Sequence, residues 1–362
     1  KPRLQSIIQS THFKTYKHRF RSAQVNRTLH HPALYQPKMR NEKKDLGEQK
    51  KTREKHSFVI CADTQFGILM DGIPMKEPNW DTEVDLSRRA VEKINAMKPK
   101  PLFVCVCGDL VDTESSFSSA TASWKKIMRK WEHEVIMDQQ NRDWKKVWAQ
   151  LDPSIALVCL CGNHDVGNRP TEASIDVFRE SFGDEYLSFW ANGTYNICIN
   201  NVLFFDPTGA PKMFEEQLDW LQDRLEYATK EKAKQIFVFG HYPWFLYHED
   251  EDDDRVLSTS SPPVGWGAPG AAFKDSYFNI PLENRKFVLS LFRKHNVKAC
   301  FSGHFHQNLV SKTSWGMDMI ITGPLSLVLK SNGKPKSTEP DLNGMRVVEV
   351  GDMDYTHRFV PL

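Results

Sequence analysis

Residues 159–165 read Cys-Leu-Cys-Gly-Asn-His-Asp and close an apolar run that begins at Ile155. Gly162 permits a sharp turn at the end of a predicted strand. Asn163 offers a neutral oxygen to a hard cation, and Asp165 can orient the imidazole of His164. Taken alone, the stretch predicts either chemistry held at a strand end or an ordinary turn with a locally bonded histidine.

Four further predicted strands end in similar polar clusters, which decides between these alternatives. The clusters are Asp63-x-Gln65, Gly108-Asp109, Gly240-His241 and Gly303-His304-x-His306. Sites in open α/β sheets form beyond the carboxyl ends of the strands, so we expect the five clusters to converge. Carboxylate and amide oxygens with imidazoles suit Mn, Fe or Zn in a two-metal centre better than a structural zinc site.

Strands and helices alternate along most of the chain, which predicts a layered α/β core. The predicted strands cover residues 57–62, 102–107, 155–161, 235–239 and 299–302. The predicted helices cover residues 82–97, 120–150, 214–230 and 282–295. Residues 195–199 and 202–205 flank Asn200-Asn201 and predict a hairpin with a tight turn. The closing strands, at 319–322, 345–350 and 355–360, suggest a second, partly antiparallel sheet.

The charge of the chain is uneven. Residues 1–55 hold 15 Lys and Arg against 4 Asp and Glu, about +11, whereas the remainder carries about −9. We predict a basic, disordered N-terminal extension over residues 1–55; a transit peptide is an alternative, because such segments are rich in Arg and poor in acid. A nucleic-acid-binding arm is disfavoured, since the segment contains no binding module that we recognise.

The cysteines and the hydropathy of the chain help to predict the cellular compartment of the protein. Five of the seven cysteines lie in or beside short apolar runs, as reduced, buried thiols do, so no disulfide framework is expected. No apolar stretch approaches the roughly 20 residues that a membrane span requires. We expect a cytoplasmic protein, or a mitochondrial one if the basic segment is a transit peptide.

The five clusters, in this order, resemble the calcineurin-like metallophosphoesterase signature DxH, GDxxD, GNHD, GH and GHxH. The segments at 62–67, 162–168, 186–190, 249–254 and 343–348 are similar to the calcineurin-like phosphoesterase domain-containing protein 1 family, regarded as serine/threonine phosphatases. The resemblance implies a four-layer α/β/β/α sandwich of two mixed sheets flanked by helices over residues 56–362. Residues 255–273 then form a loop insertion.

The resemblance also implies the site residues. The first metal would be held by Asp63, Gln65, Asp109 and His306, and the second by Asp109, Asn163, His241 and His304. Both would be divalent ions (Mn, Fe, Mg or Zn), with a bridging hydroxide that attacks phosphorus. His164 would protonate the leaving oxygen and Asp165 would orient it. Gln65 replaces the usual His, which favours Mn or Mg over Zn; Asp112 has the signature's spacing and is either supporting or structural.

The implied activity is hydrolysis of phosphomonoesters, with phosphoserine or phosphothreonine in a protein partner as the substrate. The alternatives are a phosphodiesterase or nucleotide hydrolase on the same two metals, or a non-catalytic metal-binding scaffold. The acidic run at 249–254 predicts a solvated loop or a rim that repels highly anionic substrates. Neither a membrane nor a nucleic acid is expected as a partner, and the oligomeric state is not indicated.

Overall fold

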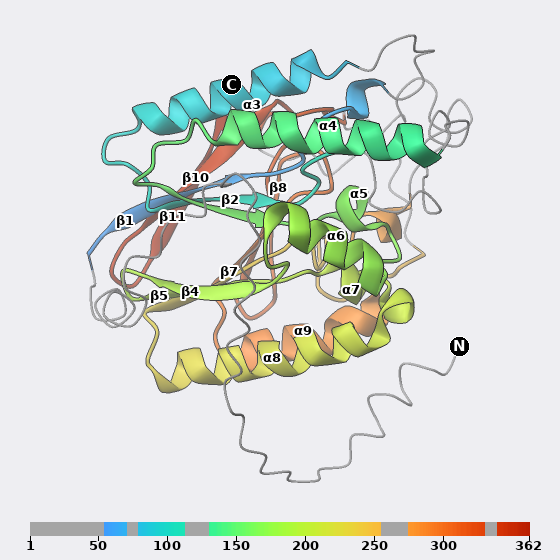
Figure 1. The fold of residues 1–362 in the computed structure, drawn as a ribbon. Helices are drawn as coiled ribbons and strands as arrows, with labels where there is room; N and C mark the ends of the chain where they lie inside the picture. The colour runs from blue at the N-terminus through green and yellow to red at the C-terminus, as the bar shows by residue number, and fades with distance from the viewer. Residues whose placement is uncertain (1–53, 71–78, 113–129, 255–273, 330–338) are drawn as a thin grey trace, which may run out of the picture. The chain divides into compact units, whose positions relative to one another are not determined.

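The computed structural model describes residues 54–70, 79–112, 130–254, 274–329 and 339–362. The predicted basic extension therefore lies outside the described residues except for Glu54 and Lys55, and the predicted insertion at 255–273 lies outside them as well. The described strands form two mixed sheets, as predicted (Figure 1).

The first sheet carries three of the predicted site clusters. Its strand order is β11 (Tyr355–Pro361), β10 (Gly344–Val350), β1 (His56–Cys61), β2 (Phe103–Cys107), β3 (Ala156–Leu160). β1, β2 and β3 are parallel, while β10 and β11 continue the sheet in antiparallel fashion. The carboxyl ends of β1, β2 and β3 therefore meet at one edge.

The second sheet carries the other two clusters. Its strand order is β4 (Leu187–Ala191), β5 (Thr194–Cys198), β6 (Gln235–Phe239), β7 (Ala299–Ser302), β9 (Asp318–Ile321), β8 (Leu309–Lys312). β5, β6, β7 and β9 are parallel, and the outer strands β4 and β8 pair in antiparallel fashion.

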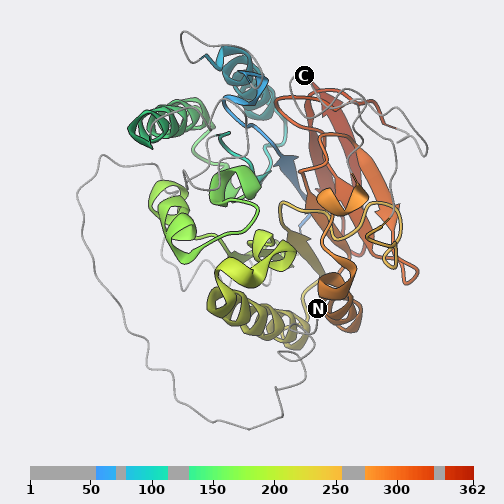
Figure 2. The ribbon, with the colours of Figure 1, turned by 90° about the vertical axis from the view of Figure 1, so that its right-hand side faces the viewer.

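Helices cover the outer face of each sheet. The first sheet is covered by α3 (Asp81–Ala96) and α4 (Lys130–Trp148), and the second by α8 (Pro211–Lys230) and α9 (Leu282–Lys294) (Figure 1). Figure 2 shows α8 and α9 together on the side opposite α3 and α4. The predicted α/β/β/α sandwich is confirmed. Short helices fill the connections: α5 (Asn163–Val166), α6 (Glu172–Phe182), α7 (Val202–Phe205), η1 (Ile68–Met70), η4 (Pro207–Gly209) and η5 (Asp275–Tyr277).

The inner strands β1, β2 and β6 are apolar along most of their length because each sheet lies between two layers. Phe58 and Ile60 of β1 face the second sheet, whereas Val59 and Cys61 face the helices. The Phe58 ring stacks on Phe103 with centroids 4.7 Å apart, and it meets the rings of three phenylalanines of the opposite sheet: Phe237, Phe239 and Phe301. This aromatic layer joins the two sheets and so places their strand ends side by side.

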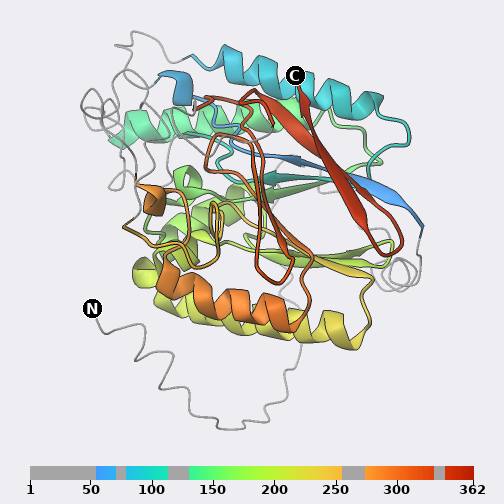
Figure 3. The same ribbon diagram turned by 180° about the vertical axis from the view of Figure 1, so that it is seen from behind.

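Two predictions about secondary structure need correction, and a third is tested over part of its length only. Residues 202–205 form the helix α7, so the predicted hairpin around Asn200-Asn201 is wrong; β5 pairs with β4 and β6 instead. The closing strands do not build a separate sheet: β9 joins β7, while β10 and β11, red in Figure 3, join the blue β1. The helix predicted over 120–150 is observed as α4, and residues 120–129 lie outside the described part.

The seven cysteines are all free, and six of them are buried, as predicted for reduced thiols. None of the helices in the described ranges is long and apolar enough to cross a membrane.

Candidate metal centre

The five polar clusters follow the carboxyl ends of β1, β2, β3, β6 and β7, near α5 in Figure 1. Five non-glycine residues in them have a positive φ: Asp63 (51°), Gln65 (34°), Asp109 (52°), His304 (65°) and His306 (55°). Such backbone conformations persist only where the surrounding structure holds them, and they concentrate at functional sites. The site is therefore assembled from strained strand-to-loop turns.

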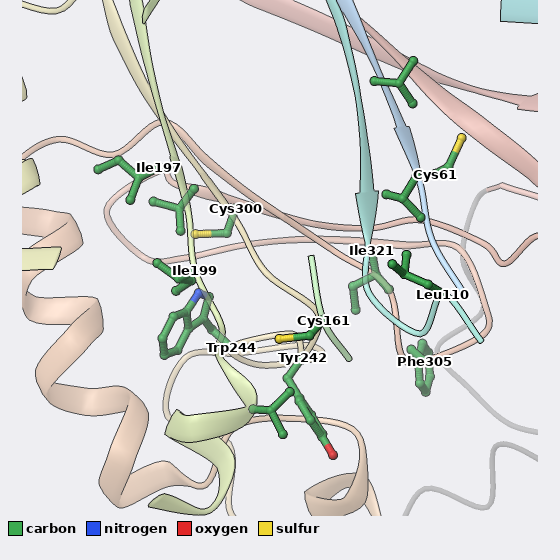
Figure 4. Packing of buried hydrophobic residues seen from close by; sticks show 14 of the residues in the cluster. Cys61, Leu110, Cys161, Ile197, Ile199, Tyr242, Trp244, Cys300, Phe305 and Ile321 are labelled. Carbon is green, nitrogen blue, oxygen red and sulfur yellow. The ribbon is translucent and has the colours of Figure 1, made fainter. Parts of the chain in front are cut away.

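Apolar residues next to the site residues anchor these turns in the core. Leu110 follows Asp109, and Phe305 separates His304 from His306; both apolar side chains are buried. Figure 4 shows these two side chains, and also Cys161 and Tyr242, among the packed apolar residues. Each turn thus has one side chain in the core and its neighbour in the site.

The clusters bring two groups of possible metal ligands together. One group is Asp63, Asp109 and His306, and the other is Asp109, His241 and His304; within each group the ligand atoms lie within 4.8 Å of one another. His306 Nε2 is 3.5 Å from Asp63 Oδ1, and His241 Nε2 is 3.3 Å from Asp109 Oδ2. Because both groups share Asp109, the arrangement suits two cations bridged by one carboxylate.

The two predicted amide ligands lie in the same place. Asn163 Oδ1 is 2.9 Å from His241 Nε2, in the second group. Gln65 Nε2 donates to Asp109 Oδ2 at 3.0 Å, beside the first group. All seven predicted metal ligands therefore converge on Asp109, as the alignment of strand ends led us to expect.

Backbone carbonyls hold the second nitrogen of each of the three imidazoles in these groups. His241 Nδ1 is 2.9 Å from the carbonyl oxygen of Cys107. His304 Nε2 is 2.9 Å from that of Tyr277, and His306 Nδ1 is 2.5 Å from that of Leu327. A carbonyl at one ring nitrogen makes that nitrogen the donor and leaves the other as a neutral lone pair for a metal.

The charge of the site also fits cations. Asp63 and Asp109 are 0% and 1% exposed, and among the described residues their ion pairs are all with histidines. Burial raises the pKa of Asp63 to about 8 despite the charge of His241. Burial also lowers the pKa of His306 to about 4, so this imidazole is neutral. Despite its burial, the charge of Asp109 raises the pKa of His241 to about 9, so without metal this imidazole holds a proton that a bound divalent cation would displace.

Two glycines leave room for the carboxylates. A Cβ on Gly162 would lie 2.1 Å from Asp109 Oδ1, and a Cβ on Gly303 would lie 2.3 Å from Asp63 Oδ2. Both distances are far below a normal contact, so only glycine lets the backbone approach these oxygens so closely. The glycines of the motif therefore have a steric role here beyond the turn.

His164 lies at the amino end of α5, where its peptide N–H donates to Asp109 Oδ1 at 2.8 Å. Its ring Nδ1 is 2.8 Å from Asp112 Oδ1. Asp165, the expected orienting residue, instead accepts the peptide N–H groups of Gly162, Leu110 and Val111. The carboxylate that faces the imidazole is thus Asp112, and Asp165 holds the loop after β2 against the loop after β3.

The model of the calcineurin-like phosphoesterase family matches residues 56–308, which include every one of these clusters. The chain belongs to the calcineurin-like phosphoesterase family. It is a hydrolase of phosphoric esters, and this phosphoesterase has a candidate dimetal site at the residues just described.

Curated relatives agree with this assignment, and a solved structure shares the fold. The phosphoesterase is 31% identical over 316 residues to the serine/threonine-protein phosphatase CPPED1 of Danio rerio, covering 86% of each chain. It is likewise 31% identical to CPPED1 of Homo sapiens over 84% of this chain and 83% of the relative. The structure of purple acid phosphatase PPD1 from yellow lupin (Lupinus luteus) seeds shares the fold, with a TM-score of 0.54 at 11% identity, covering 85% of this chain and 52% of that one.

The surface above the ligands is a depression with an apolar wall. Asp109, His164, His304 and His306 lie at its base, and its wall is formed by Ile68, Tyr277, Phe278, Leu327 and Leu329. The sequence offered no signal for this wall, because isolated apolar residues in loops resemble any others.

The acidic run is more ordered than a solvated loop. Its residues alternate, so that Asp250, Asp252 and Asp254 are exposed whereas Glu249 and Glu251 are buried. The Glu251 carboxylate accepts the peptide N–H groups of Leu246 and Tyr247, and it also accepts the amide of Asn279. The run therefore ties the segment after His241 to the segment that carries the apolar wall.

Asn201 is a supporting residue that the sequence did not reveal. Its side-chain oxygen accepts the peptide N–H groups of His241 and Tyr242 at 2.8 and 3.0 Å, and its amide donates to the Tyr242 carbonyl at 2.7 Å. These bonds hold the turn that presents His241. The predicted hairpin turn concealed this role.

Proposed function

We propose that this phosphoesterase hydrolyses phosphoserine and phosphothreonine monoesters in proteins and uses two divalent cations to do so. The observation that carries the proposal is the pair of ligand groups that share Asp109, with His164 beside them. The relatives named serine/threonine-protein phosphatase support the choice of ester and of a protein substrate.

Asp63, Gln65, Asp109 and His306 would hold the first cation, and Asn163, His241 and His304 would join Asp109 around the second. Bound cations supply positive charge for the phosphoryl oxygens and a water that is acidic enough to attack near neutral pH. The protein contributes oriented imidazoles and buried carboxylates, so no nucleophilic side chain is required.

His164 acts as the general acid in this proposal. Its Nδ1 faces Asp112, so Nε2 is the nitrogen that can donate a proton to the leaving oxygen. The imidazole lies at the base of the depression and is 8% exposed, so a leaving group bound there can reach it. Asp112 stabilises the protonated ring and fixes its orientation.

The proposal is tested with metal-stripped protein to which Mn, Mg or Zn is returned. The substrates are a phosphoseryl peptide and a phosphodiester, and the variants are His164→Ala and the control His295→Ala. His295 is also buried, but it bonds Thr229 on the helical side of the second sheet.

We expect metal-dependent release of phosphate from the peptide, a loss of about 10² on removing His164, and no loss in the control. Preferential cleavage of the diester would refute the monoesterase assignment. No turnover of either ester with any metal would favour the scaffold alternative.

A further inference from the structure

Gln65 is the one ligand position that departs from the family signature, and its side chain is held on both sides. The residue is fully buried, and its peptide N–H donates to the Asp109 carbonyl at 2.9 Å. Its amide nitrogen lies 3.0 Å from Asp109 Oδ2, and its oxygen lies 3.3 Å from Ser326 Oγ. The backbone of Gln65 is thus fixed, and the carboxamide can only rotate about the Cγ–Cδ bond.

Ser326 has a single hydroxyl hydrogen to give. Its Oγ is 2.6 Å from the Asp63 carbonyl oxygen and 3.3 Å from Gln65 Oε1. The carbonyl can only accept, and the shorter distance makes it the better partner for the hydroxyl hydrogen. The hydroxyl oxygen of Ser326 is then an acceptor on the side that faces Gln65.

The two orientations of the carboxamide suit two different states of the centre. With its nitrogen toward Asp109, Gln65 donates a hydrogen bond to a carboxylate that has no cation beside it. With a cation at Asp109, the amide nitrogen in this orientation would face positive charge. If the carboxamide rotates by half a turn, its oxygen faces the cation and its nitrogen donates to Ser326 Oγ. In the observed orientation Gln65 Oε1 faces a hydroxyl whose hydrogen points to the Asp63 carbonyl, whereas the half-turned carboxamide gives its nitrogen an acceptor in Ser326 and its oxygen a cation, so the turned orientation pairs both ends of the side chain.

We propose that Ser326 is a positioning residue that turns Gln65 into a neutral oxygen ligand of the first cation. Asn343 supports it, because its amide donates to the Ser326 carbonyl at 2.5 Å. This inference rests on the dinuclear centre of the proposed function, but it concerns metal binding and does not depend on turnover.

The test is calorimetric titration of Mn²⁺ into the metal-stripped protein. The variants are Ser326→Ala, Gln65→Leu and the double variant, with Ser87→Ala as the control because Ser87 is equally buried but lies in α3. We expect Ser326→Ala to weaken one of two binding events by about 10-fold, as loss of a group that orients a ligand does. Gln65→Leu should weaken the same event at least as much, and the double variant should be no weaker than Gln65→Leu.

A second background keeps the test independent of the folding of Gln65→Leu. Gln65→Glu offers an oxygen in either orientation, so adding Ser326→Ala there should change Mn²⁺ affinity less than 3-fold, against about 10-fold in the Gln65 background.

Mn²⁺ binding by Gln65→Leu as tight as that of the natural chain would overturn the inference, as would equal effects of Ser326→Ala in the Gln65 and Glu backgrounds. If the natural chain binds no Mn²⁺, both this inference and the proposed dinuclear centre are refuted. If the natural chain binds two Mn²⁺ with these couplings but cleaves no phosphopeptide, only the proposed function fails.

Discussion

Asn201→Ala should destabilise the protein although the residue touches no substrate. The side chain is 1% exposed and makes three hydrogen bonds to the backbone of His241 and Tyr242. Its removal leaves two peptide N–H groups and one carbonyl without these partners. A buried polar group that loses its partner costs about 1–3 kcal/mol, so we expect the free energy of unfolding to fall by at least about 3 kcal/mol.

The measurement is equilibrium denaturation of the metal-free protein, so that a change in metal binding does not enter. Asn196→Ala is the matched control: Asn196 is 0% exposed in β5, but the hydrogen bond from its amide to Thr194 Oγ1 is long, at 3.4 Å. We expect a cost of about 1 kcal/mol there, within the range for a typical single hydrogen bond. Equal costs for the two variants would refute the reasoning, because burial alone would then explain the effect of Asn201.

Two further predictions concern the backbone and the basic segment. Gly162→Ala should displace the Asp109 carboxylate, since the new Cβ would lie 2.1 Å from its Oδ1. We therefore expect the Mn²⁺ affinity, measured by calorimetry, to fall about 10-fold or more. An unchanged affinity would contradict this prediction and show that the loop moves aside freely. Deletion of residues 1–55 should leave the protein in the cytoplasm when its distribution is imaged in cells, whereas loss of a mitochondrial pool on deletion would favour the transit-peptide alternative.

The layered core and the convergence of the site were predictable because both follow from local patterns. Strands buried on both faces contain continuous apolar runs, as in residues 236–239, and the strand bounds predicted for 235–239 agree with β6. Parallel strands end at one edge, so polar residues after those strands must meet. Neither conclusion required knowledge of the loops.

The supporting contacts were not predictable, because they join residues that are distant in sequence. Asp165 is adjacent to His164 in the sequence and Asp112 is distant from it, yet the structure shows that Asp112 faces the ring while Asp165 accepts three peptide N–H groups. Likewise, residues 202–205 are apolar enough for a strand, but β5 already has neighbours on both sides and the segment turns into α7. Tertiary pairing overrides local propensity in such short segments.

We propose that two divalent cations at Asp63, Asp109 and their histidines make this chain a phosphomonoesterase. The most direct measurement is phosphate release from a phosphoseryl peptide as Mn²⁺ is added stepwise to the metal-stripped protein. We predict no release without metal and a rate that rises until two equivalents are bound. A rate that is unchanged by stripping the metal, or the absence of any release after two equivalents are bound, would contradict the claim.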